Sequence, residues 1–110
     1  MANLISITID CADAHRLANF WTMALDGYMA DDSGIVLKSD AGPAIYFQEV
    51  PEPKTVKNRL HLDIGTKDAK GEIFRLERLG AKVITEKAQG GHEWVILADP
   101  EGNEFCVSAM

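Results

Sequence analysis

The sequence predicts an α+β fold made of two βαβββ units, and two observations lead to this prediction. Apolar and polar residues alternate in residues 5–10 and again in residues 59–64, as in a β-strand with one face on a core. An aspartate and an amphipathic segment follow each alternating stretch, at Asp13 and at Asp68, which are 55 residues apart. The chain is therefore interpreted as two copies of one unit.

The first unit is expected to span residues 1–50. Asp13 is a good helix N-cap, because its carboxylate can accept hydrogen bonds from free backbone N–H groups. The helix that follows, up to Leu25, carries an apolar stripe that includes Trp21, which we expect in the core. Its four strands are predicted at residues 3–10, 28–30, 35–38 and 44–50.

Residues 51–58 are predicted to be a linker, since Pro51 and Pro53 cannot extend a central strand. The second unit, residues 59–110, repeats the order of the first, with a helix that Asp68 caps, that runs through about Leu79 and that Gly80 ends. Four strands are expected at residues 59–65, 81–86, 92–98 and 104–108, with a flexible loop at residues 88–91.

The alternation in residues 59–64 assigns side chains to the two faces of that strand. Leu60, Leu62 and Ile64 are expected to face the core, and His61 and Asp63 are expected to face the opposite, polar side. Two such units side by side would curve their remaining sheet faces around a shared cleft. The predicted architecture is therefore one domain, residues 1–110, with a curved mixed sheet around a cleft.

The composition excludes several classes of protein. The 110 residues carry a net charge of −6, which argues against nucleic acid or an anionic membrane as partner, because both require a basic face. No apolar run is long enough to cross a membrane, and no signal peptide is recognisable, so a cytoplasmic location is expected. Cys11 and Cys106 lack the spacing of a disulfide framework and are interpreted as free thiols.

Three motifs in this order resemble the vicinal oxygen chelate superfamily, which includes glyoxalases, bleomycin-resistance proteins and extradiol dioxygenases. They are Asp13 with Phe20-Trp21 in the first helix, the segment from Arg59 to Asp63, and the turn and strand from Asp99 to Phe105. The Leu-Ala-Asn-Phe-Trp segment makes the chain most similar to the small glyoxalase-like subgroup. The resemblance covers the whole chain and implies a cleft for a small molecule.

The resemblance also implies four positions for the ligands of a divalent metal, on the first and last strands of each unit. The resemblance implies histidine or glutamine at Ser6, a carboxylate at Tyr46, histidine at His61 and glutamate at Cys106, so only His61 is of the expected type. Gln48, on the same face as Tyr46, could add a weak oxygen ligand. We therefore expect no bound metal. The alternative is Zn, Ni, Mn or Fe held by His61, Cys106 and Gln48.

Three functions remain open on the sequence, and the last in rank is a dimerising domain with no ligand. The first is binding of a small aromatic molecule in the cleft, without a complete metal site. The second is a metal-dependent lyase, isomerase or dioxygenase, in which the metal polarises vicinal oxygens. A homodimer is expected, as in relatives that pair or exchange their units. His15 and His92 are interpreted as surface residues, and the predicted ligand-binding residues are Ser6, Tyr46, Gln48, His61, Asp63 and Trp94.

Overall fold

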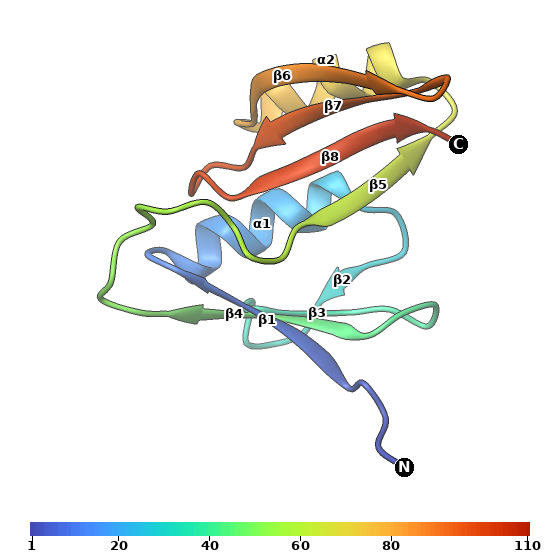
Figure 1. Ribbon diagram of the computed structural model, residues 1–110. Helices are drawn as coiled ribbons and strands as arrows, with labels where there is room; N and C mark the ends of the chain where they lie inside the picture. The colour runs from blue at the N-terminus through green and yellow to red at the C-terminus, as the bar shows by residue number, and fades with distance from the viewer. The chain divides into compact units, whose positions relative to one another are not determined.

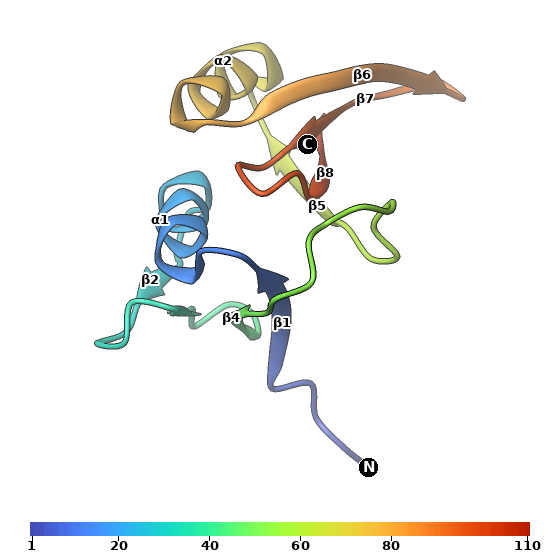
Figure 2. The same cartoon turned by 90° about the vertical axis from the view of Figure 1, so that its left-hand side faces the viewer.

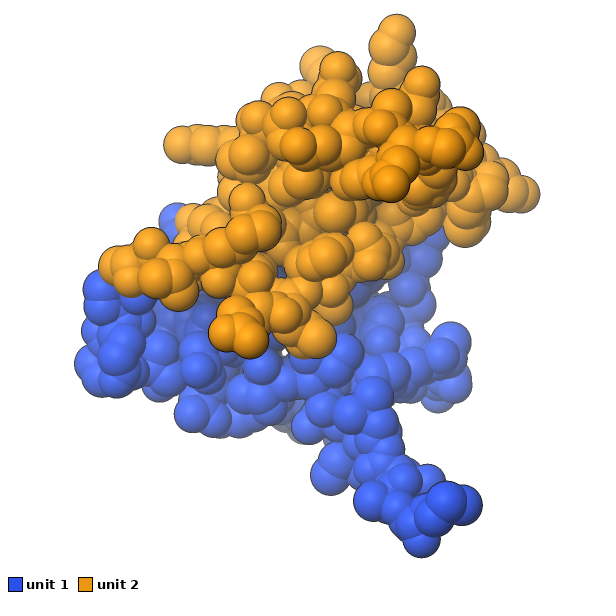
Figure 3. Space-filling model, viewed as in Figure 1, with its two compact units in different colours: residues 1–53 blue, residues 54–110 orange.

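The computed structural model describes residues 1–110 and divides them into two compact units, residues 1–53 and residues 54–110 (Figure 3). The boundary falls inside the predicted linker. Each unit has the order βαβββ, with a four-stranded mixed sheet, so the α+β fold class predicted from the sequence is confirmed. Neither helix is long and apolar enough to span a membrane.

The sheet of the first unit has the strand order β1-β4-β3-β2. Strands β1 and β4 run parallel, and the other neighbours are antiparallel. The elements of this unit are β1 (Ser6–Cys11), α1 (Ala14–Ala24), β2 (Met29–Ala30), β3 (Val36–Lys38) and β4 (Ala44–Glu49).

Helix α1 forms where the sequence predicts it, and two carboxylates cap its N-terminus. Asp13 Oδ1 accepts from the Arg16 N–H at 3.1 Å, and Glu49 Oε2, at the end of β4, accepts from the Ala14 N–H at 3.0 Å. Both satisfy backbone donors that a helix leaves free. The apolar stripe packs on the sheet, and Trp21 is 2% exposed, so its predicted place in the core is confirmed.

The second unit has the equivalent strand order β5-β8-β7-β6, with β5 parallel to β8. Helix α2 contacts one face of this sheet (Figures 1 and 2). It begins after the N-cap Asp68, whose side chain accepts from the Gly71 N–H, and ends at Gly80 with φ 118°. The elements are β5 (Leu62–Thr66), α2 (Ala69–Leu79), β6 (Lys82–Gln89), β7 (His92–Ala98) and β8 (Glu104–Ala109).

The core of the second unit lies between α2 and its sheet. Leu76 of α2 is fully buried, as are Leu97 of β7 and Val107 of β8. Because side chains alternate along a strand, the residues between these positions point to the opposite sheet face. That second face therefore carries Asp63, Cys106 and their neighbours.

The first strand of each unit begins later than predicted. Strand β1 starts at Ser6 instead of Asn3, and β5 starts at Leu62 instead of Arg59. Leu60 was expected in the core and is 68% exposed, and Ile5, on the apolar face of the first predicted strand, is 81% exposed. The pairing registers explain the correction, since the first paired residues are Ser6 with Ala44 and Leu62 with Phe105. Ile5 and Leu60 precede this pairing.

The predicted flexible loop at residues 88–91 is also wrong. Strand β6 continues to Gln89, and β7 begins at His92, so only Gly90 and Gly91 connect them. Their φ angles are 61° and 80°. Positive φ at both central residues is the requirement of a two-residue type I′ hairpin turn, which matches the twist of the flanking strands. The two glycines therefore close a tight hairpin.

Candidate functional site

A hollow of about 560 Å³ lies on the second unit, on the face of its sheet that carries Asp63 and Cys106. Strands β5, β7 and β8 line it, together with the segment that precedes β5. This volume is within the range of small-molecule sites in proteins. The lining has a polar end and an aromatic end.

The pairing register places the lining side chains in rows across the sheet. Cys106 of β8 lies opposite Asp63 on one side and opposite Ile96 on the other, and Trp94 lies opposite Ser108. Side chains at paired positions point to the same face of a sheet. The row from β5 through β8 to β7 therefore presents a carboxylate, a thiol and an aliphatic side chain to the hollow.

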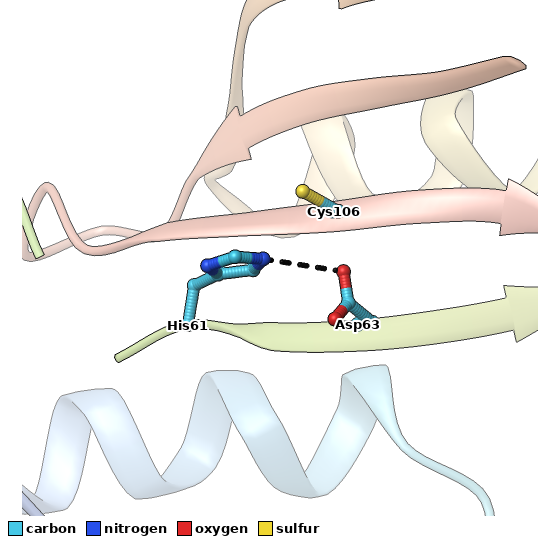
Figure 4. A group of neighbouring side chains, drawn as sticks. All are labelled: His61, Asp63 and Cys106. Atoms are coloured by element: carbon cyan, nitrogen blue, oxygen red, sulfur yellow. Dashed lines mark ion pairs between the residues drawn. The ribbon is translucent and has the colours of Figure 1, made fainter. Parts of the chain in front are cut away.

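The polar end is formed by His61, Asp63 and Cys106 (Figure 4). His61 Nε2 lies 3.3 Å from Asp63 Oδ1, and one ligand atom from each of the three residues lies within 4.8 Å of the others. The side chains of His61 and Asp63 are 51% and 73% exposed. An ion pair this exposed adds little to folding stability. The His61 and Asp63 side chains can therefore contact a ligand without the loss of an interaction that the fold requires.

The thiol of Cys106 is held in its neutral form. Burial raises the pKa of this thiol, and the negative charge of Asp63, which also accepts a hydrogen bond from it, raises the pKa further. The thiolate is the nucleophilic form of cysteine. Cys106 is therefore poorly suited to act as a nucleophile on its own.

The aromatic end is formed by His92 and Trp94 of β7. Their rings stack, with centroids 5.4 Å apart and planes at 26°. Trp94, one of the predicted ligand-binding residues, lines the hollow together with Ile96. His92 is exposed, as expected, yet its ring also lines the hollow.

The segment before β5 contributes residues that the sequence analysis missed. Lys57 forms an ion pair with Glu104, and this hydrogen bond lowers the pKa of the Glu104 carboxyl. Asn58 donates from Nδ2 to the backbone oxygen of Glu104 at 3.3 Å, while its buried Oδ1 has no partner.

Strand β8 also contributes lining residues that were not predicted. Glu104 and Ser108 share a strand face with Cys106, so alternation could have identified both. Asn58 lay in the predicted linker and carried no such signal.

The predicted site residues divide between the two units. His61, Asp63, Trp94 and Cys106 all line the hollow of the second unit. Ser6, Tyr46 and Gln48 belong to the sheet of the first unit, on β1 and β4, and their part in ligand binding remains a prediction. His61 immediately precedes β5 rather than lying in the middle of a strand.

The strand registers show which positions are equivalent. Tyr46 lies opposite Thr8 in the first unit, and Cys106 lies opposite Asp63 in the second. The first unit therefore has a phenol where the second has a thiol, and it does not supply the ligands that the resemblance implies. The second unit adds Asp63, whose carboxylate the sequence analysis had not counted as a metal ligand. Its imidazole, carboxylate and thiol fit an ion that accepts nitrogen, oxygen and sulfur, such as Zn²⁺.

Two βαβββ units with equivalent registers form the fold that the sequence resemblance implies. The family model of the glyoxalase-like domain matches residues 6–108. The chain belongs to the glyoxalase-like domain family, and the resemblance seen in the sequence is confirmed. No curated protein matches the chain.

Solved structures share the fold at low sequence identity. An enzyme of the glyoxalase, bleomycin resistance protein and dioxygenase family from Burkholderia phytofirmans is 21% identical, with 98% of each chain covered and a TM-score of 0.73. TnmS3, an antibiotic binding protein from a Streptomyces species, is 16% identical, with 99% and 96% covered and a TM-score of 0.69. A mutant of the fosfomycin resistance protein FosX from Listeria monocytogenes, in complex with Mn(II) and a dihydroxypropylphosphonic acid, is 14% identical, with 98% and 90% covered and a TM-score of 0.77.

Proposed function

We propose that this protein binds a small aromatic molecule in the hollow of its second unit, without a divalent metal that stays bound through purification. One observation carries the proposal: a stacked pair of aromatic rings, His92 and Trp94, lies in the same hollow as the polar group of His61 and Asp63. Ligand sites typically combine an apolar, aromatic wall with a few polar groups that fix orientation. The antibiotic-binding neighbour TnmS3 supports the same type of function.

His61 is the proposed polar contact of the ligand. Its ring lines the hollow, is half-exposed, and is oriented by Asp63 Oδ1 at 3.3 Å. The other ring nitrogen, Nδ1, is available to a ligand. Because His61 precedes β5 and contributes nothing to the core, its loss should affect binding far more than folding.

The experiment is a thermal-shift screen of aromatic compounds in the presence of a chelator, followed by calorimetric titration of the best compound. A specific ligand raises the melting temperature by mass action. His61→Ala should weaken its binding by about 1–3 kcal/mol, the usual cost of an unpaired buried polar group. The melting temperature of the free variant should change little.

His15→Ala provides the matched control, because His15 is an exposed histidine on α1 of the first unit. It should bind the compound like the wild type. A screen without any stabilising aromatic compound would contradict the proposed function. Unchanged affinity in His61→Ala would contradict the role of His61 and leave Trp94→Ala to test the aromatic wall.

A metal-dependent lyase, isomerase or dioxygenase is the second candidate function. The observation that favours it is the convergence of His61, Asp63 and Cys106, and the neighbour FosX is described with Mn(II). A metal held there would act as a Lewis acid on substrate oxygens. Elemental analysis separates the candidates, since stoichiometric Zn, Ni, Mn or Fe in protein purified without added metal would favour the enzyme.

A further inference from the structure

We infer that His61, Asp63 and Cys106 form a site, complete within the second unit, that takes up an added thiophilic divalent cation. Zn²⁺ is the expected ion, and Co²⁺ and Cd²⁺ are suitable probes. The inference does not rest on the proposed aromatic ligand. It also departs from the resemblance, which places ligands on both units and does not include the position of Asp63.

The distances between the donor atoms carry the first step. Zinc bonds of about 2.0–2.3 Å in tetrahedral geometry place neighbouring ligand atoms roughly 3.3–3.8 Å apart. His61 Nε2 and Asp63 Oδ1 already have a separation of 3.3 Å. All three donor atoms lie within 4.8 Å of one another, so closure around an ion requires a shift of about 1 Å from exposed side chains.

The chemistry of the donors sets the selectivity. A thiolate ligand, which forms as the bound ion displaces the Cys106 proton into solvent, favours zinc and other thiophilic ions. Mg²⁺, Ca²⁺ and Mn²⁺ instead prefer sites made of carboxylate, carbonyl and water oxygens. Cys106 stands where the resemblance implies a carboxylate, so the substitution moves the preference away from Mn²⁺. Three protein ligands are also the number found in open zinc sites, which keep one position for water or a ligand.

The surroundings of the three residues permit loading from solution. His61 and Asp63 are at least half-exposed, and none of the three side chains belongs to the buried core. Open access and only three ligands are compatible with a protein that is purified without metal and binds it on addition. The other cysteine, Cys11, is buried in the first unit beside the backbone oxygen of Gln48.

The experiment is a titration of the whole chain with Co²⁺, followed by its absorption spectrum. Coordination by Cys106 should produce a thiolate-to-cobalt charge-transfer band in the near ultraviolet that saturates at one ion per chain. Cys106→Ser should abolish this band. Asp63→Asn and His61→Ala should weaken cobalt binding by roughly tenfold or more, because even outer-shell partners of a metal contribute that much.

Cys11→Ser is the matched control, since it removes the other thiol and should leave the band unchanged. Zn²⁺ should displace Co²⁺ at equimolar concentration, and Mn²⁺ should not. The absence of a saturable band, its survival in Cys106→Ser, or displacement by Mn²⁺ would overturn the inference. Asp63→Asn keeps the test valid if Cys106→Ser fails to fold, because the Asp63 side chain is 73% exposed. The thermal-shift screen of aromatic compounds is carried out in the presence of a chelator. Its outcome, and with it the proposed function, therefore does not depend on these metal-binding results.

Discussion

Asp31 shows how one local hydrogen-bond pattern sets the protonation of a single residue. Its carboxylate accepts hydrogen bonds from the backbone N–H and the hydroxyl of Ser33. The Ser33 hydroxyl is the largest cause that lowers the pKa of Asp31 below its ordinary value of 3.8. A side-chain carboxyl signal of Asp31 in an NMR titration should therefore have its midpoint below 3.8, and Ser33→Ala should move that midpoint upward.

The sign of the linked stability follows from the direction of this shift. A carboxyl whose pKa is lower in the folded than in the unfolded state stabilises the fold above the unfolded pKa, and this contribution disappears as the pH falls through the folded pKa. Acid unfolding below pH 4 should therefore be steeper in the wild type than in Ser33→Ala. Superimposable Asp31 titrations in the two proteins would show that the hydroxyl has no effect.

Single residues also show how far the site could be predicted. Alternation along the strand correctly placed Asp63 on the face opposite the core, because side-chain period in a strand does not depend on tertiary context. His61 and Asp63 are two residues apart in the sequence, whereas Cys106 comes close to them only through the parallel register of β5 and β8. That register joins residues more than forty positions apart in the sequence, so no local pattern encodes it, and Asp63 was not recognised as a metal ligand.

The hairpin between β6 and β7 gives a prediction for a whole element. Gly90 and Gly91 both have positive φ, and a Cβ at either position would meet nothing within 4 Å. Substitutions there act through backbone conformation alone. Gly90→Asn should be close to neutral, within about 1 kcal/mol, since asparagine tolerates this region. Gly91→Val should destabilise by more than about 1 kcal/mol, because a β-branched residue at positive φ is strained.

Denaturant unfolding of the two variants measures both effects. The difference in stability between the two variants reports backbone conformation alone, because neither new side chain displaces a neighbour. Equal stability of Gly91→Val and the wild type would mean that the hairpin adopts another turn in solution.

At the scale of elements, the sequence predicted what local chemistry determines. The N-caps Asp13 and Asp68 and the helix end at Gly80 lie where expected, since a cap needs only its own turn. The first strands of the two units begin at Ser6 and Leu62, and both were predicted to begin too early, because a partner strand decides where pairing begins. The turn at Gly90 and Gly91 was predicted too long because its length depends on strand twist.

At the scale of the whole molecule, the two units keep one topology and carry different chemistry. Both pair their first and last strands in parallel with the same relative register. At equivalent positions the first unit has Ser6 and Tyr46, and the second has His61 and Cys106. The group of His61, Asp63 and Cys106 lies in the second unit. The first unit has the same architecture and a buried core around Trp21, without such a group.

Large apolar side chains on the surface of both units lead to the last prediction, that the protein is a homodimer. Ile5, Phe74 and Ile84 are 81%, 63% and 52% exposed, and Leu60 is 68% exposed. Pairing or exchange of identical units is an accessible route to a dimer and would cover such side chains. Light scattering at micromolar concentration should give twice the chain mass of 12.1 kDa. The melting temperature should rise with protein concentration, since association stabilises the folded chain by mass action. A monomer mass together with a concentration-independent melting temperature would contradict the prediction.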